Sequence, residues 1–124
     1  MQWSGIRFTR VEAESRKQEN FASMAIKLDI NDMKIENGGL RIIFSYSIDY
    51  KPDIATIKFD GYITLKGKRD ELAKLESGWR KEKIIPRSVA EPLINVVKFN
   101  AETNGVLVAK AINIVPPLLA PRIE

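Results

Sequence analysis

The fold is decided by residues 40–50, LRIIFSYSIDY, in which every second side chain from Leu40 to Tyr50 is apolar. The residues between them are mostly polar. Successive side chains of a β-strand point to opposite faces of a sheet. The alternation therefore predicts a strand with one apolar face and one largely polar face.

A second stretch, ATIKFDGYITLK at residues 55–66, alternates in the same way after the turn Lys51-Pro52-Asp53. Two such strands joined by a turn of about three residues form an antiparallel hairpin. We therefore predict that the apolar faces of both strands form one side of a hydrophobic core. The opposite face then meets water or a partner.

Two further strands are predicted before the hairpin. Residues 5–14 form the first, with a β-bulge near Thr9-Arg10, and residues 23–36 form the second, in which the alternation changes phase at Asn31-Asp32. Asn37-Gly38-Gly39 predicts a tight turn, because Asn and Gly tolerate positive φ. The short links imply one four-stranded antiparallel sheet with meander or Greek-key topology.

Two helices are predicted after the hairpin. The first spans residues 70–81, with Asp70 as its N-cap, and the second spans residues 88–111, where Ser88 and Glu91 match a capping box. The apolar residues that share one broad side of the second helix are Val89, Leu93, Val96, Val97, Ala101, Val108, Ala111 and Ile112. That breadth predicts that the second helix covers the apolar face of the sheet.

Two features near the C-terminus leave alternatives open. Asn104-Gly105 either bends the second helix or divides it in two. The segment at residues 112–124, INIVPPLLAPRIE, is extended, because proline fixes φ and lacks a backbone donor. Its leucines favour docking on the protein's own domain, and the alternative is a ligand for an aromatic groove.

The predicted architecture is α+β, a four-stranded antiparallel sheet with one face covered by a long helix, in a single domain at residues 1–124. The chain contains no cysteine and no histidine, which excludes thiolate ligands, zinc sites and Cys–His or Ser–His catalysis. Carboxylate chemistry or a lysine nucleophile remains possible, so a small enzyme that uses carboxylates is a third alternative, but we expect no enzyme, catalytic residue, metal or cofactor. Without a signal peptide or an apolar run of ~20 residues, we expect a cytoplasmic protein that does not insert into membranes.

The net charge of +4 indicates weak attraction to polyanions. Basic residues gather at residues 66–83, but acidic residues interrupt them, so a solvated surface is favoured over a nucleic-acid site. A basic accessory protein associated with nucleic acid remains the alternative function. Abundant Lys, Glu and Ile without cysteine indicate a thermophilic source.

Five apolar residues are candidates for contact with a partner, because they lie in loops, in the charged first helix or in the tail. They are Phe21, Trp79, Leu118, Leu119 and Ile123. The competing interpretation for each of them is closure of the core.

The order of these elements resembles the SecB family of export chaperones, which have four antiparallel strands, a long helix and then an extended Pro/Leu segment. Residues 25–30, AIKLDI, resemble the Lys-Leu-Asp run of that family's second strand. Residues 116–121, PPLLAP, resemble its post-helix segment, and residues 107–111, LVAKA, are similar to the end of its long helix.

The resemblance implies a polypeptide-binding module that holds unfolded or extended clients in an apolar groove without nucleotide or metal. It also implies a homo-oligomer, a dimer or a tetramer. The chain departs from the family in three ways. It is basic where the family is acidic, its charged helix at residues 70–81 is an addition, and we expect no counterpart of the family's second helix after residues 116–121. The alternative is a structural or interaction protein without chaperone activity.

Overall fold

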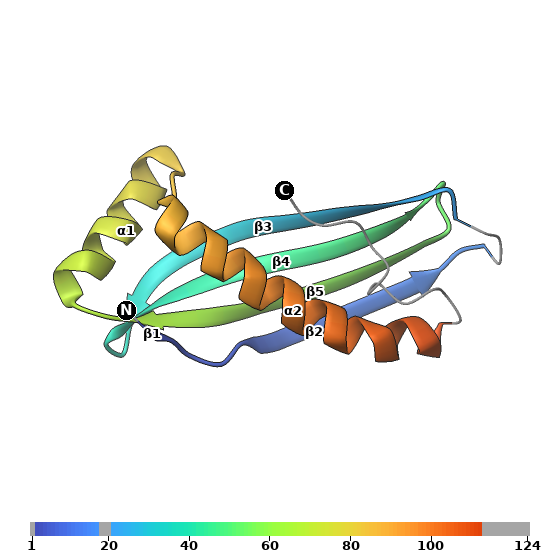
Figure 1. The fold of residues 1–124 in the computed structure, drawn as a ribbon, viewed down its shortest axis with the longest axis horizontal. Helices are drawn as coiled ribbons and strands as arrows, with labels where there is room; N and C mark the ends of the chain where they lie inside the picture. Colours follow the sequence, from blue (N-terminus) through green and yellow to red (C-terminus); the bar gives the residue numbers. More distant parts are fainter. Residues whose placement is uncertain (1, 18–20, 113–124) are drawn as a thin grey trace.

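The computed structural model describes residues 2–17 and 21–112. Five strands come first and two helices follow (Figure 1). The strands are β1 (Gln2–Trp3), β2 (Arg7–Ser15), β3 (Ser23–Glu36), β4 (Gly39–Lys51) and β5 (Ala55–Lys66). The helices are α1 (Arg69–Glu82) and α2 (Arg87–Ala111). The α+β fold class is therefore confirmed, and the sheet contains one more strand than expected.

All strand pairs are antiparallel. The meander β3-β4-β5 forms the centre, and β1 and β2 pair one after the other with the remaining edge of β5. Because β2 precedes the meander in sequence but lies beside its last strand, the topology is a Greek key. The additional strand β1 has only two residues, and no alternation of side chains can be recognised over so short a length.

Both predicted irregularities are confirmed. The pairing of β2 with β5 shifts between Phe8 and Arg10, and the pairing of β3 with β4 shifts between Ile30 and Asp32. Each shift returns the apolar side chains that follow it to the core side of the sheet. The turn before β4 also forms as expected, with positive φ at Asn37 and Gly38.

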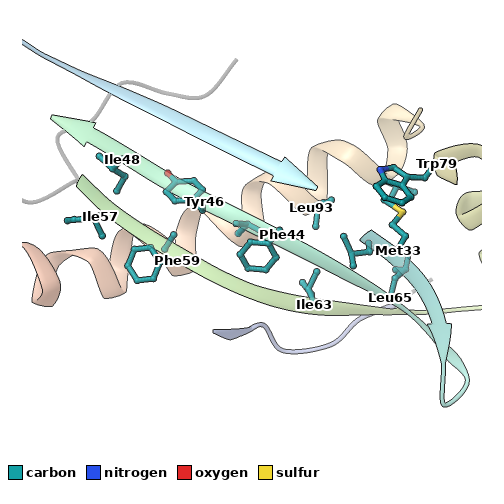
Figure 2. Close-up of a cluster of buried hydrophobic side chains, with 14 of the residues drawn as sticks. Met33, Phe44, Tyr46, Ile48, Ile57, Phe59, Ile63, Leu65, Trp79 and Leu93 are labelled. Carbon is teal, nitrogen blue, oxygen red and sulfur yellow. The ribbon is translucent and has the colours of Figure 1, made fainter. Parts of the chain in front are cut away.

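The core lies between one face of the sheet and α2 (Figure 2). The alternating apolar residues of β4 and β5 are almost completely buried: Leu40, Ile42, Phe44, Tyr46, Ile48, Tyr50, Ala55, Ile57, Phe59, Ile63 and Leu65. The buried side of α2 repeats every fourth residue: Val89, Leu93, Val97, Ala101, Gly105 and Ala109. The predicted cover of the sheet by this helix is thus confirmed.

Several local expectations about the helices are wrong. α1 begins at Arg69, so Asp70 lies in its first turn and Lys68 is the N-cap. α2 begins at Arg87 after the N-cap Pro86, so Ser88 is already helical and the capping box does not form. Glu91 pairs instead with the Arg87 guanidinium. Ala111 is exposed.

Helix α2 continues through Asn104-Gly105 without division. The glycine lies on the buried side of the helix, in line with Ala101 and Ala109. Packing of both flanking turns on the sheet offsets the weak helix propensity of glycine.

Two glycines provide a matched test of this fold. A Cβ added at Gly61 in β5 would overlap the Arg7 carbonyl oxygen and lie 3.0 Å from Phe8 Cα, so Gly61→Ala forces β2 away from β5. We expect Gly61→Ala to lower the free energy of unfolding by about 1–3 kcal/mol, the usual cost of overpacking. The measurement is urea unfolding followed by circular dichroism.

The control for this test is Gly78→Ala in α1. The added Cβ would meet only the Ile84 carbonyl oxygen, at 3.8 Å. Alanine is favoured over glycine inside a helix, so this variant should be more stable by about 0.5–1 kcal/mol. Equal effects of the two substitutions would contradict the close approach of β2 to β5.

Candidate functional site

The outer strand of the meander carries an apolar surface that the helices leave partly open. Four side chains of β3, which we call the β3 strip, point to the core side of the sheet but are only partly buried. They are Met24, Ile26, Leu28 and Ile30. In the pairing register they lie opposite Tyr50, Ile48, Tyr46 and Phe44 of β4, which are almost completely buried. The β3 strip therefore extends the core face outward to the sheet edge.

The β3 strip is open because one helix cannot cover the whole sheet. Helix α2 packs on β4 and β5 and crosses the sheet obliquely, from the β3 side near α1 toward the β2 side (Figure 1). A helix with its side chains is ~10 Å wide, whereas strands are spaced ~4.8 Å apart. Four strands side by side therefore leave apolar side chains uncovered at the edges.

Helix α1 closes one end of the β3 strip. Glu76 Oε2 accepts a hydrogen bond of 2.8 Å from the Ile35 backbone N–H, and Arg80 Nη2 donates one of 3.0 Å to the Met33 carbonyl oxygen. The Arg80 guanidinium also lies 3.8 Å from Asp32 Oδ1. These side chains satisfy outward-facing backbone groups of the edge strand, which would otherwise be open to pairing with another strand.

Among the strands that the structure describes, β3 pairs only with β4. The edge of β3 from Ser23 to Ile30 therefore keeps outward-facing backbone groups next to the apolar side chains of the β3 strip. Such an edge can take up an extended polypeptide by two means at once, through main-chain hydrogen bonds and through burial of alternate side chains.

The structure places the five sequence-predicted residues in different settings. Phe21 lies at the other end of the β3 strip, where its ring contacts Tyr50 edge-on with 5.3 Å between ring centroids. Trp79 is 7% exposed and lies beside Met33, with Lys83 Nζ 3.6 Å from the centroid of its ring (Figure 2). Leu118, Leu119 and Ile123 lie outside the described residues, so their contact with a client stays a prediction.

Sequence reasoning predicted the alternating strand at residues 23–36 but did not identify the β3 strip as a partly exposed apolar surface. The alternation of its side chains is the same as that of the buried rows in β4 and β5. The β3 strip differs from the buried rows because β3 lies at the edge of the sheet, away from the path of α2. Strand order and the helix path are tertiary features that the alternation does not reveal.

A polar group is buried beneath α2 next to the β3 strip. The Tyr46 hydroxyl is buried and, among the described residues, makes no hydrogen bond. Burial, and secondarily the Glu102 carboxylate, raise the pKa of Tyr46. Glu102 is held by Lys98, one turn earlier in α2, at 2.7 Å. Burial also raises the pKa of Tyr50 to about 12.

The opposite face of the sheet is polar and carries both signs of charge. Ser45 links Asn31 and Asp60 through hydrogen bonds of 2.8 and 2.6 Å. Arg41 lies over the Tyr62 ring, with 4.2 Å from its guanidinium carbon to the ring centroid. Because the charges are mixed and paired with one another, this face has no field of one sign that would attract a strongly charged partner.

Helices α1 and α2 enclose a second apolar feature. A cleft of about 320 Å³ lies between them, with Leu75, Gly78, Ile84, Pro86 and Val89 among its lining residues. On the outer side of α2, Phe99 and Leu107 are each 70% exposed. The molecule therefore presents apolar side chains at several places besides the β3 strip.

Comparison with solved structures identifies the fold. The chain is similar to the SecB-like chaperone Rv1957 of Mycobacterium tuberculosis, solved in complex with a ChAD peptide from the Rv1956 HigA1 antitoxin. The TM-score is 0.61, and the match covers 99% of this chain and 88% of that chain at 12% sequence identity. The fold is SecB-like. No family model matches the sequence, and no curated protein matches it either.

Residues 2–17 and 21–112 offer neither a metal site nor a membrane-crossing helix. No group of three or more Asp or Glu side chains in these ranges is arranged to hold a metal ion. No helix in the same ranges has the length and apolar character needed to cross a membrane.

The buried tyrosines make stability depend on alkaline pH. Tyr50 has a folded-state pKa of about 12 against an ordinary value of 10.0, so the unfolded chain releases its proton first. Protonated Tyr50 therefore makes its full contribution to the free energy of unfolding below about pH 10. That contribution is lost as the pH rises through about 12. Thermal unfolding measured by circular dichroism between pH 8 and 12 should show a falling midpoint.

Tyr46→Phe separates the two tyrosines. The Tyr46 hydroxyl has no hydrogen-bond partner among the described residues, so its removal leaves no group unpaired. We expect unchanged stability or a gain of up to about 1 kcal/mol at pH 7, and a smaller alkaline loss than in the unsubstituted protein. A loss above about 1 kcal/mol at pH 7 would contradict the buried, unpartnered hydroxyl.

Proposed function

We propose that this protein binds unfolded or extended polypeptide and holds it without nucleotide or metal, as an ATP-independent chaperone. The observation that carries this proposal is the partly open β3 strip beside the edge of β3 that pairs with no other described strand. The SecB-like fold supports it, and so does the peptide bound by the similar mycobacterial chaperone.

The chemistry of the β3 strip fits an unfolded chain better than a folded partner. Side chains at every second position of a strand match the period of an extended client, whose alternate side chains also lie ~7 Å apart. The edge backbone groups bind any sequence, because every non-proline residue offers a donor and an acceptor. Side-chain burial then favours clients with exposed apolar residues, which are those that aggregate.

Phe21 and Trp79 have supporting roles in this proposal. Phe21 lies at the open end of the β3 strip and can extend the apolar surface there. Trp79 anchors α1 in the core, and α1 ends the strip through Glu76 and Arg80. A client is therefore limited at the α1 end and can continue freely past Phe21.

Replacement of the β3 strip tests the proposal. In Ile26→Thr/Leu28→Thr, both residues keep a high strand propensity but lose most of their apolar surface. We expect roughly tenfold more protein to be needed for half suppression of client aggregation, from a loss of about 0.7 kcal/mol per residue. The measurement is light scattering from heated citrate synthase.

The matched control is Lys27→Thr/Asp29→Thr, which changes the same strand on its opposite face. Circular dichroism must show that both variants remain folded at the assay temperature. The proposal fails if the unsubstituted protein in molar excess does not suppress aggregation, or if both double variants behave alike. Raising the salt concentration should leave apolar binding intact, whereas nucleic-acid association would weaken steeply.

We further propose that the protein is a homo-oligomer in which β2 of one subunit pairs with β2 of another. Among the described strands, β2 pairs with β5 alone, so its outer edge is open. Val11 points to the core side of the sheet opposite Phe59, yet it is 47% exposed. A second β2 placed antiparallel beside it would cover Val11 and remove the free edge.

The charges of β2 favour one register for this pairing. When the twofold axis passes through Val11, Arg10 lies opposite the partner's Glu12 on the polar face, and the same pair occurs a second time by symmetry. An axis through Arg10 places two arginines opposite each other. An axis through Glu12 places two glutamates opposite each other, although it also sets Arg10 opposite the partner's Glu14. An axis through Ala13 opposes Glu12 to the partner's Glu14.

A charge exchange tests this register. Arg10→Glu alone would oppose two carboxylates at each of two places, so we expect the dimer to dissociate at concentrations where the unsubstituted protein is dimeric. Arg10→Glu/Glu12→Arg restores opposite charges and should restore the dimer. Sedimentation velocity gives the mass. A monomeric unsubstituted protein, or no rescue by the double variant, would contradict the pairing.

A further inference from the structure

The chain itself contains a segment with the chemistry that the β3 strip requires. Residues 113–121, NIVPPLLAP, carry no charge and include the adjacent leucines Leu118 and Leu119. We propose that this segment docks on the β3 strip of its own chain and competes there with clients. The inference rests on the proposed function, to which it adds a built-in competitor that sets the affinity for clients.

The exit of the chain from α2 favours this docking. Helix α2 ends at Ala111, and Ile112, whose N–H donates to the Val108 carbonyl oxygen at 3.3 Å, is partly buried against the core. Ile112, the last described residue, therefore lies on the side of α2 that faces the sheet. The end of α2 lies at the same end of the sheet as the start of β3 and the end of β2 (Figure 1).

The segment is long enough to cross the sheet. From β2 to β3 there are three strand spacings, or roughly 14 Å. Leu118 is six residues beyond Ile112, and an extended proline-rich chain advances ~3.1 Å per residue, which gives a reach of roughly 19 Å. Leu118 and Leu119 can therefore reach the Met24 end of the β3 strip.

The same arithmetic excludes the cleft between the helices as a site for these leucines in the same chain. That cleft lies beside Val89, at the N-terminal end of α2. Val89 and Ile112 are separated by roughly 35 Å along the helix axis, at a rise of 1.5 Å per residue. Six extended residues do not span that distance, so the cleft is out of reach of these leucines in the same chain, whereas the β3 strip is within reach.

The prolines make such a segment a weak occupant. Pro116, Pro117 and Pro121 lack a backbone N–H, so the segment cannot pair fully with the edge of β3. A client without proline gains those main-chain hydrogen bonds and displaces it. Each proline fixes its own φ in the unbound segment as well, which lowers the entropy lost on docking. Docking is thus favourable but reversible.

A disulfide trap tests the docking directly, because the natural chain has no cysteine. Met24→Cys/Leu118→Cys places one thiol at the near end of the β3 strip and one in the segment. Ala25→Cys/Leu118→Cys is the matched control, because Ala25 lies on the opposite face of the same strand. Both proteins are oxidised at low concentration and examined by mass spectrometry and non-reducing electrophoresis.

We expect the first variant to form an intrachain disulfide at least several-fold faster than the second. Equal rates would overturn docking on the β3 strip. A disulfide formed mainly between chains would overturn docking within the same chain. This readout involves no client, so it decides the docking even if the proposed chaperone function fails.

Competition is tested in the full chain with Leu118→Asp/Leu119→Asp, and Arg122→Ser is the control beyond the apolar segment. The probe is a fluorescein-labelled apolar 12-residue peptide without proline, followed by fluorescence anisotropy. If the segment is docked in about nine of ten molecules, its release tightens peptide binding about tenfold.

The control should bind the peptide as the unsubstituted protein does. Unchanged affinity in the double aspartate variant would overturn the competition. Weaker binding would also overturn it, because the leucines would then contact the client rather than replace it.

Discussion

The burial of two alternating apolar rows, one on β4 and one on β5, against α2 is the interaction on which the rest of the structure depends. The row from Leu40 to Tyr50 loses almost all contact with water, and the stripe that covers it repeats every fourth residue along α2. Both patterns belong to regular elements, so one long helix and one hairpin form a continuous core. The remaining elements take their positions around this contact.

The same interaction explains why the molecule has open apolar surface. One helix spans about two strands, but the sheet is four strands wide along most of its length. The outer strands β2 and β3 therefore present core-facing side chains, such as Val11 and Leu28, that α2 does not fully cover. Helix α1 covers only one end of β3. The proposed client surface, the proposed subunit contact and the proposed competing segment all use this incomplete cover.

Much of the fold could be predicted because its signals are local. The phase changes at Thr9-Arg10 and Asn31-Asp32 are visible in the order of apolar residues, and both are β-bulges. The helix caps were predicted wrongly, because Asp70 and Ser88 match capping residues but each helix begins before them. The extent of each helix depends on where the preceding segment leaves the sheet, which is a tertiary constraint. The burial of Trp79 could not be predicted either, because a tryptophan in a charged helix can pack on the core or contact a partner protein.

The sequence alone determined the four long strands, the two helices and the face of the sheet that packs in the core. It also excluded chemistry based on cysteine or histidine. These follow from the residue types and from the periods of 2.0 and 3.6 residues. The tertiary structure alone decided which apolar rows are buried and which remain open. The alternation of β3 is the same as that of β4, and only strand order and the oblique path of α2 distinguish them. Burial is a property of neighbours in space, and those neighbours come from distant parts of the chain.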